Sequence, residues 1–218
     1  MEILYLDKRV VAVNKPYGMP SQSDPTGDID AMIATAEELR ARGEGDKLWL
    51  VHRLDRTVGG VLVFARTSKA AAELSEAFSS RSARKEYFAV VSGDVEEGEY
   101  TDYIYKDSAA GKAFVTDKER KGVKAASLYC TPLASLDIEW GRVTLVKVAL
   151  DSGRFHQIRV QLASRGSSIL GDGKYGSRVR CKPMALFSSR LEIGELSVFT
   201  SPPEEHPAFK LFDRSLFK

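Results

Sequence analysis

Four charged or titratable side chains are crowded into a short segment between two apolar runs early in the chain. Residues 52–56 read His-Arg-Leu-Asp-Arg, and a Gly59-Gly60 pair closes the segment. The flanking residues 48–51 and 61–65 are apolar, which predicts two buried strands. A loop between rigid strands is a common position for functional side chains, because the scaffold fixes them while solvent still reaches them. Asp55 is the candidate for chemistry, since a carboxylate can act as a nucleophile or as a base.

The same segment also has a plainer interpretation. It could be a charged surface turn in which Asp55 pairs with Arg53 or Arg56. A second segment, far downstream, favours the functional interpretation. Residues 151–162 read Asp-Ser-Gly-Arg-Phe-His-Gln-Ile-Arg-Val-Gln-Leu, a run that again combines His and Arg with apolar positions.

The downstream segment predicts a helix over residues 155–165, stopped by Gly166. On that helix His156 and Arg159 share one face at a spacing of three residues. Gln157 and Gln161 are expected on an exposed side. A guanidinium on such a helix can keep a buried carboxylate ionised by opposing its desolvation.

Together the two segments resemble the signatures of the RluA family of pseudouridine synthases. In that family a His-Arg-Leu-Asp loop and a Gly-Arg-x-His-Gln-Ile-Arg helix meet at the active site. Further segments match in family order: Val-Asn-Lys-Pro-Tyr-Gly at 13–18, Lys-Glu-Tyr-Phe-Ala-Val-Val at 85–91, Ile-Leu-Gly-Asp at 169–172 and Tyr-Gly at 175–176. The match covers the catalytic core, and we expect no auxiliary N-terminal RNA-binding domain.

The resemblance implies an isomerase that detaches uracil from C1′ at N1, turns it, and rejoins it through C5. It implies that Asp55 is the nucleophile, that Arg159 pairs with it, and that no cofactor or metal takes part. Tyr87 would pack on the target base. Arg53 would occupy the gap left by the extruded uridine, because a stacked nucleotide cannot react at its glycosidic bond. Lys85 would be a structural or a phosphate contact.

Basic residues gather around the second signature. Between residues 154 and 182 seven basic side chains face one acid, Asp172, whereas the whole chain has a net charge of only +2. A basic stripe on a nearly neutral protein suits a polyanion bound at one face. The RNA contacts predicted in this stripe are Arg154, Lys174, Arg178 and Arg180.

Composition limits the class of protein. The hydrophobic content of 43% and charged content of 28% are typical of a soluble globular protein. No apolar run approaches the ~20 residues of a membrane span, and the N-terminus lacks the pattern of a signal peptide. Two cysteines are too few for a disulfide framework, which fits a reducing compartment. We therefore expect a monomeric cytoplasmic protein whose partner is RNA, with no membrane association.

Strands outnumber helices in the pattern. We therefore predict an α+β pseudouridine synthase fold, with a mixed, largely antiparallel sheet, flanking helices and a central RNA-binding cleft, as a single catalytic domain over residues 1–218. The expected strands are residues 3–6, 10–14, 48–51, 61–65, 85–92, 100–105, 125–134, 142–150, 184–193 and 196–200. The expected helices besides 155–165 are 29–42 with Asp28 as N-cap, a helix ending at Ser79 capped by Thr67 or Ser68, and a short amphipathic one containing Phe209, Phe212 and Leu216. Residues 106–124 are expected to be irregular.

The loop after Asp55 departs from the family pattern. Val58 and Gly59 stand where Thr and Ser are usual, so two hydroxyls that could orient the loop are missing. Because the segment reads as a polar loop, we expect that restoring both hydroxyls would be compatible with folding. A non-catalytic RNA-binding module that has lost turnover through this altered loop is the alternative to the enzyme.

Two other activities fit the sequence poorly. A carboxylate-based glycosidase needs two acids flanking one bond, and no second acid is placed by a motif. Residues 171–176 satisfy the G-x-G-x-x-G pattern, but a dinucleotide site needs a strand before it and a helix after it. Residues 177–183 are instead a basic segment that ends in a proline, so a tight basic loop near the RNA is predicted.

Overall fold

The computed structural model describes residues 1–119 and 121–218. Its strands are β1 (Glu2–Leu6), β2 (Val10–Lys15), β3 (Trp49–Leu50), β4 (Gly59–Ala65), β5 (Arg84–Ser92), β6 (Gly98–Asp107), β7 (Lys112–Thr116), β8 (Val123–Ile138), β9 (Gly141–Leu150), β10 (Leu186–Ile193) and β11 (Leu196–Phe199). Its helices are α1 (Ala31–Ala41), α2 (Ser68–Ser79) and α3 (Gln157–Ser164), with 3-10 turns η1 (Gly173–Tyr175), η2 (Phe209–Leu211) and η3 (Arg214–Leu216).

The chain divides into two compact units. The first consists of Met1–Lys85 and Phe187–Ser201, and the second of Glu86–Leu186 and Pro202–Lys218. The first unit therefore contains the Asp55 segment, and the second contains the His-Gln-Ile-Arg helix.

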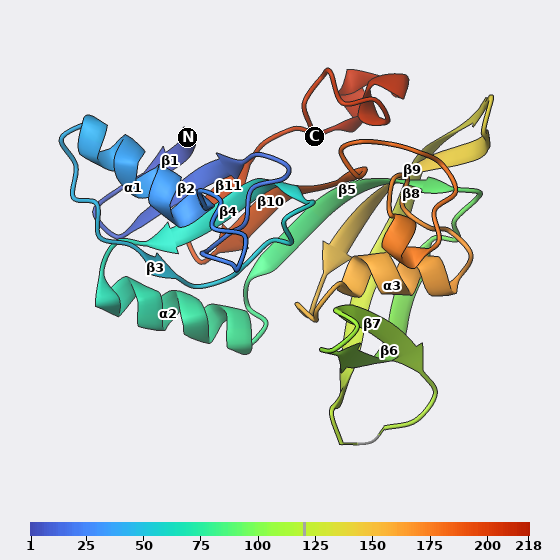
Figure 1. Cartoon of the computed structure of the whole chain (residues 1–218), viewed down its shortest axis with the longest axis horizontal. Helices are drawn as coiled ribbons and strands as arrows, with labels where there is room; N and C mark the ends of the chain where they lie inside the picture. The colour runs from blue at the N-terminus through green and yellow to red at the C-terminus, as the bar shows by residue number, and fades with distance from the viewer. Residues whose placement is uncertain (120) are drawn as a thin grey trace. The chain divides into compact units, whose positions relative to one another are not determined.

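The first unit is a small mixed sheet with two helices. β2 pairs antiparallel with β1 and with β4, while β10 runs parallel to β4. All seven residues of β4 are buried, and α1 and α2 flank the strands in Figure 1, so both faces of this strand are covered. One core cluster joins alternate residues of β2 and β4 to α2: Val10, Ala12, Val61, Val63, Ala65, Ala70 and Leu74.

Gly60 is required where β4 meets β10. Its φ is +110°, and a Cβ added there would lie 2.0 Å from the carbonyl oxygen of Ser188. Only a residue without a side chain permits this backbone approach. The second glycine of the pair that closes the charged segment therefore has a structural cause.

The start of α1 differs from the prediction. Asp30, and not Asp28, is the N-cap, and its Oδ1 accepts a hydrogen bond from the Ile33 N–H at 2.8 Å. Asp28 instead forms an ion pair with Arg56. The cap of α2 was predicted correctly, since the Thr67 side chain accepts from the Ala70 N–H at 3.1 Å.

The second unit contains an antiparallel series of strands in the order β5-β9-β8-β6-β7. The prediction that residues 106–124 are irregular is wrong for β7 and for the start of β8, while residue 120 lies outside the described part of the chain. β6 and β7 form a hairpin from the Tyr103–Thr116 pair to the Asp107–Lys112 pair. The hairpin was hidden from sequence analysis because charges surround a short alternation, in which Ala113 is buried and Phe114 is exposed.

α3 packs on this hairpin. Val160 of α3 shares a hydrophobic cluster with Ile104 of β6, Ala113 of β7 and Ala126 of β8. The expectation that Gln157 and Gln161 are exposed is wrong.

Both glutamine side chains are buried and hydrogen-bonded. Gln157 Nε2 donates to the Ser127 carbonyl at 3.0 Å, and Gln161 Nε2 donates to the Tyr100 carbonyl at 3.0 Å. Buried amides of this kind join the helix to the strands beside it.

The C-terminal segment of the second unit forms two 3-10 turns in place of the predicted amphipathic helix. Asp213 starts the second turn by accepting a hydrogen bond from the Ser215 N–H at 2.7 Å, which interrupts a continuous helix. Its apolar residues are nevertheless used as expected. Phe217 packs edge-on against Phe88 and Phe209, with ring centroids 5.1 and 5.8 Å apart.

The predicted fold class is confirmed. The structure is α+β with mixed, largely antiparallel strands and flanking helices. No helix in the described residues is both long enough and apolar enough to cross a membrane. The predicted single domain and central cleft stay predictions.

Candidate functional site

The Asp55 loop of the first unit is held by hydrogen bonds on both sides of the carboxylate. On one side, Ser21 Oγ donates to the Leu54 carbonyl at 2.8 Å and accepts from the Leu54 N–H at 3.0 Å. On the other side, the Gly18 N–H donates to the Arg56 carbonyl at 2.8 Å. The Val58 N–H closes a turn onto the Asp55 carbonyl at 3.0 Å. The residues around Asp55 therefore have a defined backbone path.

Arg56 spends its charge on a neighbouring loop. Its guanidinium pairs with Asp24 at 3.3 Å and with Asp28, and it donates to Thr26 Oγ1 at 2.9 Å. In the plainer interpretation of this segment, Arg56 was one of two arginines that could neutralise Asp55. The contacts of Arg56 with Asp24 and Asp28 weigh against that pairing.

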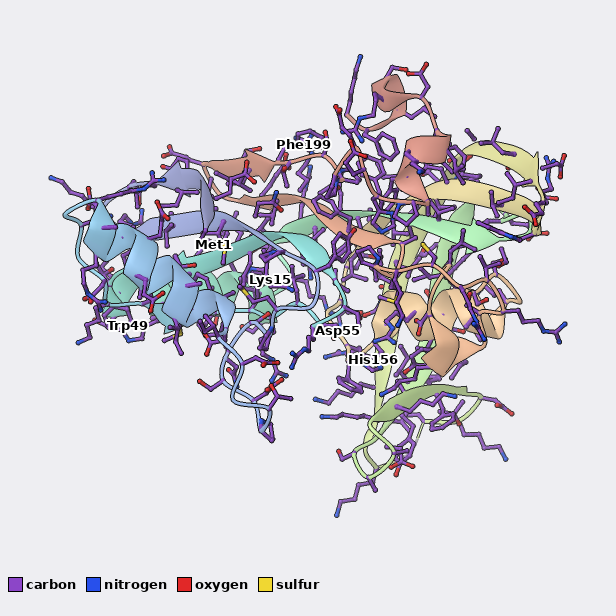
Figure 2. The ribbon with its side chains drawn as sticks, turned by 45° about the horizontal axis from the view of Figure 1, so that its top comes forward. Met1, Lys15, Trp49, Asp55, His156 and Phe199 are labelled. Carbon is purple, nitrogen blue, oxygen red and sulfur yellow. The ribbon has the colours of Figure 1, made fainter. Side chains whose placement is uncertain are left out.

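Lys15 is the charged group buried beside this loop. Its side chain is fully buried, and Nζ donates to the carbonyls of Pro16 at 3.0 Å and Met19 at 2.7 Å. Desolvation lowers the pKa of Lys15 to about 7, although the charge of Asp55 opposes this shift. Figure 2 labels both residues in the first unit.

His52 has a structural environment despite its place in the motif. Its Nε2 accepts a hydrogen bond from the Val63 N–H at 3.0 Å, and its ring stacks on Phe78 with centroids 4.6 Å apart. Desolvation lowers the pKa of His52 to about 3, and the charge of Lys85 contributes in the same direction. The imidazole is therefore neutral at physiological pH and acts as a backbone acceptor.

Gly59 lies against an aromatic ring. A Cβ at this position would be 3.1 Å from two atoms of the Tyr17 ring, and Val58 beside it is buried. The expectation that hydroxyls could be restored here at no cost to folding is therefore not supported for position 59. The structure explains the departure from the family pattern, because Tyr17 takes the space that a serine side chain would need.

In the second unit, Arg159 forms a buried ion pair with Asp172. Nε of Arg159 lies 2.7 Å from Oδ2 and Nη2 lies 2.8 Å from Oδ1, so both contacts are made in parallel. Arg159 is 6% exposed and Asp172 is 2% exposed. Such a bidentate pair fixes the plane of the guanidinium. The predicted pairing of Arg159 with Asp55 stays a prediction.

Burial separates the remaining predicted residues into two groups. Tyr87 and Lys85 are buried, and for Lys85 this favours the structural role of the two that were considered. Arg53 is exposed, as a side chain that enters an RNA helix must be.

The predicted RNA-contacting cations are placed more openly. Lys174, Arg178 and Arg180 are exposed, and Arg154 is half-buried. Arg154 Nε donates to the Ala125 carbonyl at 3.0 Å and Lys174 Nζ to the Gly111 carbonyl at 2.9 Å, so both also brace neighbouring strands or turns.

Three residues that position these groups were missing from the predicted site. Lys15 and Asp172 lie in segments that matched the family pattern, so a signal existed for both, but nothing local indicates a buried charge. Ser21 carries no sequence signal, because its partner Leu54 is 33 residues away.

The contact between Gly59 and Tyr17 predicts a compensating pair of substitutions. Gly59→Ser alone should lower the free energy of unfolding by about 1–3 kcal/mol, because the new side chain overpacks against the ring. Adding Tyr17→Ala should restore part of that loss in a double-mutant cycle measured by urea denaturation. Strictly additive losses would show that the two positions do not compete for space.

The environment of His52 predicts a loss of stability in acid. Because its folded pKa of about 3 lies below the unfolded value of 6.5, the unfolded state binds the proton first. Stability is therefore lost as the pH falls from about 6.5 towards 3. Between pH 7 and pH 5 this one group should cost about 2 kcal/mol. His52→Gln keeps an acceptor but does not titrate, so urea denaturation should show a smaller drop than in the wild type.

Comparisons with known proteins agree with this arrangement. Residues 9–164 match the family model described as RNA pseudouridylate synthase. The chain is 32% identical over 189 residues to tRNA pseudouridine synthase C of Vibrio cholerae, an alignment that covers 82% of this chain and 75% of that one. It is also 32% identical over 178 residues to ribosomal large subunit pseudouridine synthase C of Rickettsia conorii, covering 81% of this chain and 56% of that protein.

A solved structure supports the fold. The human RNA pseudouridylate synthase domain containing 1 superposes with a TM-score of 0.76 at 24% identity, covering 93% of this chain and 83% of that one. The resemblance to the RluA family is thereby confirmed. The chain belongs to the RNA pseudouridylate synthase family, and it is an isomerase that acts on RNA.

Proposed function

We propose that Asp55 is the catalytic group with which this protein converts a specific uridine of transfer or ribosomal RNA to pseudouridine. The observation that supports the proposal is the loop itself. Hydrogen bonds from Ser21 and Gly18 hold the backbone on both sides of Asp55, and the positive charge of Lys15 lies beside the carboxylate. A carboxylate with this support can act as nucleophile or base without a metal or other cofactor.

The other predicted site residues have roles that fit their burial. Tyr87 stacks on the target base, and Arg159, aligned by Asp172, pairs with Asp55 and keeps it ionised. Arg53 is exposed and takes the place of the extruded uridine in the RNA. Lys85 supports the site from within.

The relatives' names motivate the choice of RNA. One is named for transfer RNA and another for the large ribosomal subunit, so both classes are proposed here as substrates. The two units act together as one catalytic domain, with the RNA in a central cleft lined by Arg154, Lys174, Arg178 and Arg180. We place the protein in the cytoplasm as a monomer.

The central prediction concerns Asp55. Isomerisation replaces the C5–H bond of uridine, so RNA tritiated at uracil C5 should release label to water when it is incubated with the protein. Asp55→Asn is nearly isosteric and should keep RNA affinity, yet release should fall below detection because the reacting charge is lost. A chelator should leave the wild-type rate unchanged.

Two outcomes would contradict this assignment in different ways. Release by Asp55→Asn at the wild-type rate would remove Asp55 from the mechanism. RNA binding by the wild type without any release, on RNA from cells that lack the protein, would favour the alternative of a non-catalytic binding module. Glu86→Gln is a matched control, since it removes another carboxylate that has no proposed part in the reaction.

A second prediction concerns RNA affinity. If Arg178 and Arg180 contact phosphates, replacing both by Ala should weaken binding. It should also flatten the dependence of log K on log salt by about 0.7–0.9 for each lost contact. The measurement is a titration of labelled RNA at several salt concentrations. Lys210→Ala, in the C-terminal segment, is the control, and an unchanged slope in the double variant would place these arginines away from the RNA.

A further inference from the structure

Tyr175 of η1 is the centre of a cluster at the start of α3 in the second unit. Its hydroxyl accepts a hydrogen bond from the Ala113 N–H of β7 at 2.7 Å and lies 2.9 Å from Nδ1 of His156. The centre of the Arg159 guanidinium is 5.1 Å from the centroid of the Tyr175 ring. One buried phenol therefore contacts the hairpin, His156 and Arg159.

His156 is held in an uncommon backbone conformation. It occupies the N-cap of α3 with φ 54° and ψ 26°, the left-handed region, and makes no side-chain capping bond. Such a conformation is unfavourable for most L-residues, and it persists where the surrounding structure demands it. The demand here comes from the ring, which stacks on Phe155 at 3.8 Å and meets the Tyr175 ring edge-on at 5.6 Å.

The hydrogen bonds around Tyr175 favour one tautomer of His156. Because the phenolic oxygen already accepts from Ala113, its own hydrogen is best directed at Nδ1 of His156. An imidazole that accepts at Nδ1 carries its proton on Nε2 when it is neutral. The cluster therefore presents His156 as an Nε2–H donor.

The charges around this donor are positive. Lys112 Nζ lies 5.3 Å from the centroid of Tyr175, and Lys106 Nζ lies 4.7 Å from the centroid of Phe155, the ring that stacks on His156. Asp172 is the acid that contacts the cluster, and both of its oxygens are engaged by Arg159. These cations disfavour a charged imidazolium and favour an anionic acceptor for the Nε2–H.

We propose that neutral His156 donates its Nε2–H to a backbone phosphate of the RNA substrate, and that Tyr175 is the positioning residue that fixes this tautomer. The inference rests on the proposed function, because that function supplies the polyanion. It adds His156 to the RNA contacts and gives the β6–β7 hairpin a part in orienting it, through the Ala113 N–H.

The test uses a pair of amide variants. In His156→Gln the amide nitrogen can take the place of Nε2, whereas in His156→Asn it can replace only Nδ1. Asn also tolerates the left-handed backbone of this position. Circular dichroism and thermal melting should show that both variants fold.

Binding is measured with labelled transfer RNA isolated from cells that lack the protein, at several salt concentrations. His156→Asn should weaken binding about tenfold, the loss of one hydrogen bond to a charged group, whereas His156→Gln should keep most of the affinity. Because a neutral donor releases no counterion, the salt slope should be the same in both variants. A flatter slope in His156→Asn would overturn the proposal, since it would identify a charged imidazolium.

Tyr175→Phe tests the positioning role. It keeps the ring beside Arg159 but removes the hydroxyl, so binding should weaken several-fold in the His156 background. In the double variant with His156→Asn it should add nothing further. Additive losses would overturn the link between the two residues.

Label release from C5-tritiated RNA separates this inference from the proposed function. Wild-type release together with unchanged binding by His156→Asn would reject the phosphate contact alone. The absence of release by the wild type would reject the catalytic proposal, while the binding comparison of the Asn and Gln variants would still test His156.

Discussion

The burial of the Lys15 side chain is the constraint on which the Asp55 loop depends. An ammonium group taken out of water costs several kcal/mol unless its donors are satisfied and an opposite charge lies near. Two backbone carbonyls, of Pro16 and Met19, accept from Nζ, and Asp55 supplies the negative charge. The chain around Gly18 must follow a path that keeps those carbonyls inward. That same segment donates the hydrogen bond that holds the Asp55 loop in place.

The second unit uses the same physical device with a different cation. Arg159 is buried, and the bidentate contact with Asp172 offsets its desolvation. The ring of Tyr175 covers the guanidinium, and its hydroxyl reaches β7. A helix with only eight residues is thus held in orientation by polar groups as well as by its apolar side. Breaking such a buried pair by removing one partner would leave an uncompensated charge, which is more costly than losing a surface ion pair.

Charge in this protein is sorted by burial, and this bears on how it would treat RNA. Lys15 and Arg159 are buried beside groups that position them, while Arg178 and Arg180 are exposed to meet phosphates. A nearly neutral chain can in this way combine a basic surface with a functioning carboxylate. If all the cations were equally exposed, the polyanion would compete with Asp55 and Asp172 for the same charges.

The sequence by itself determined the features that depend on local pattern. It identified the signature segments, most strands and the Thr67 cap, because periodicity and capping involve residues a few positions apart. Tertiary structure decided the rest. Asp28 lost the α1 cap to Asp30 because Arg56, 28 residues away, recruits it. Gly59 replaces a serine because the ring of Tyr17 fills that space. The hairpin of β7 depends on burying Ala113 against α3, and the partner of Arg159 comes from a loop beyond its helix. These pairings join distant parts of the chain, and no local spacing encodes them.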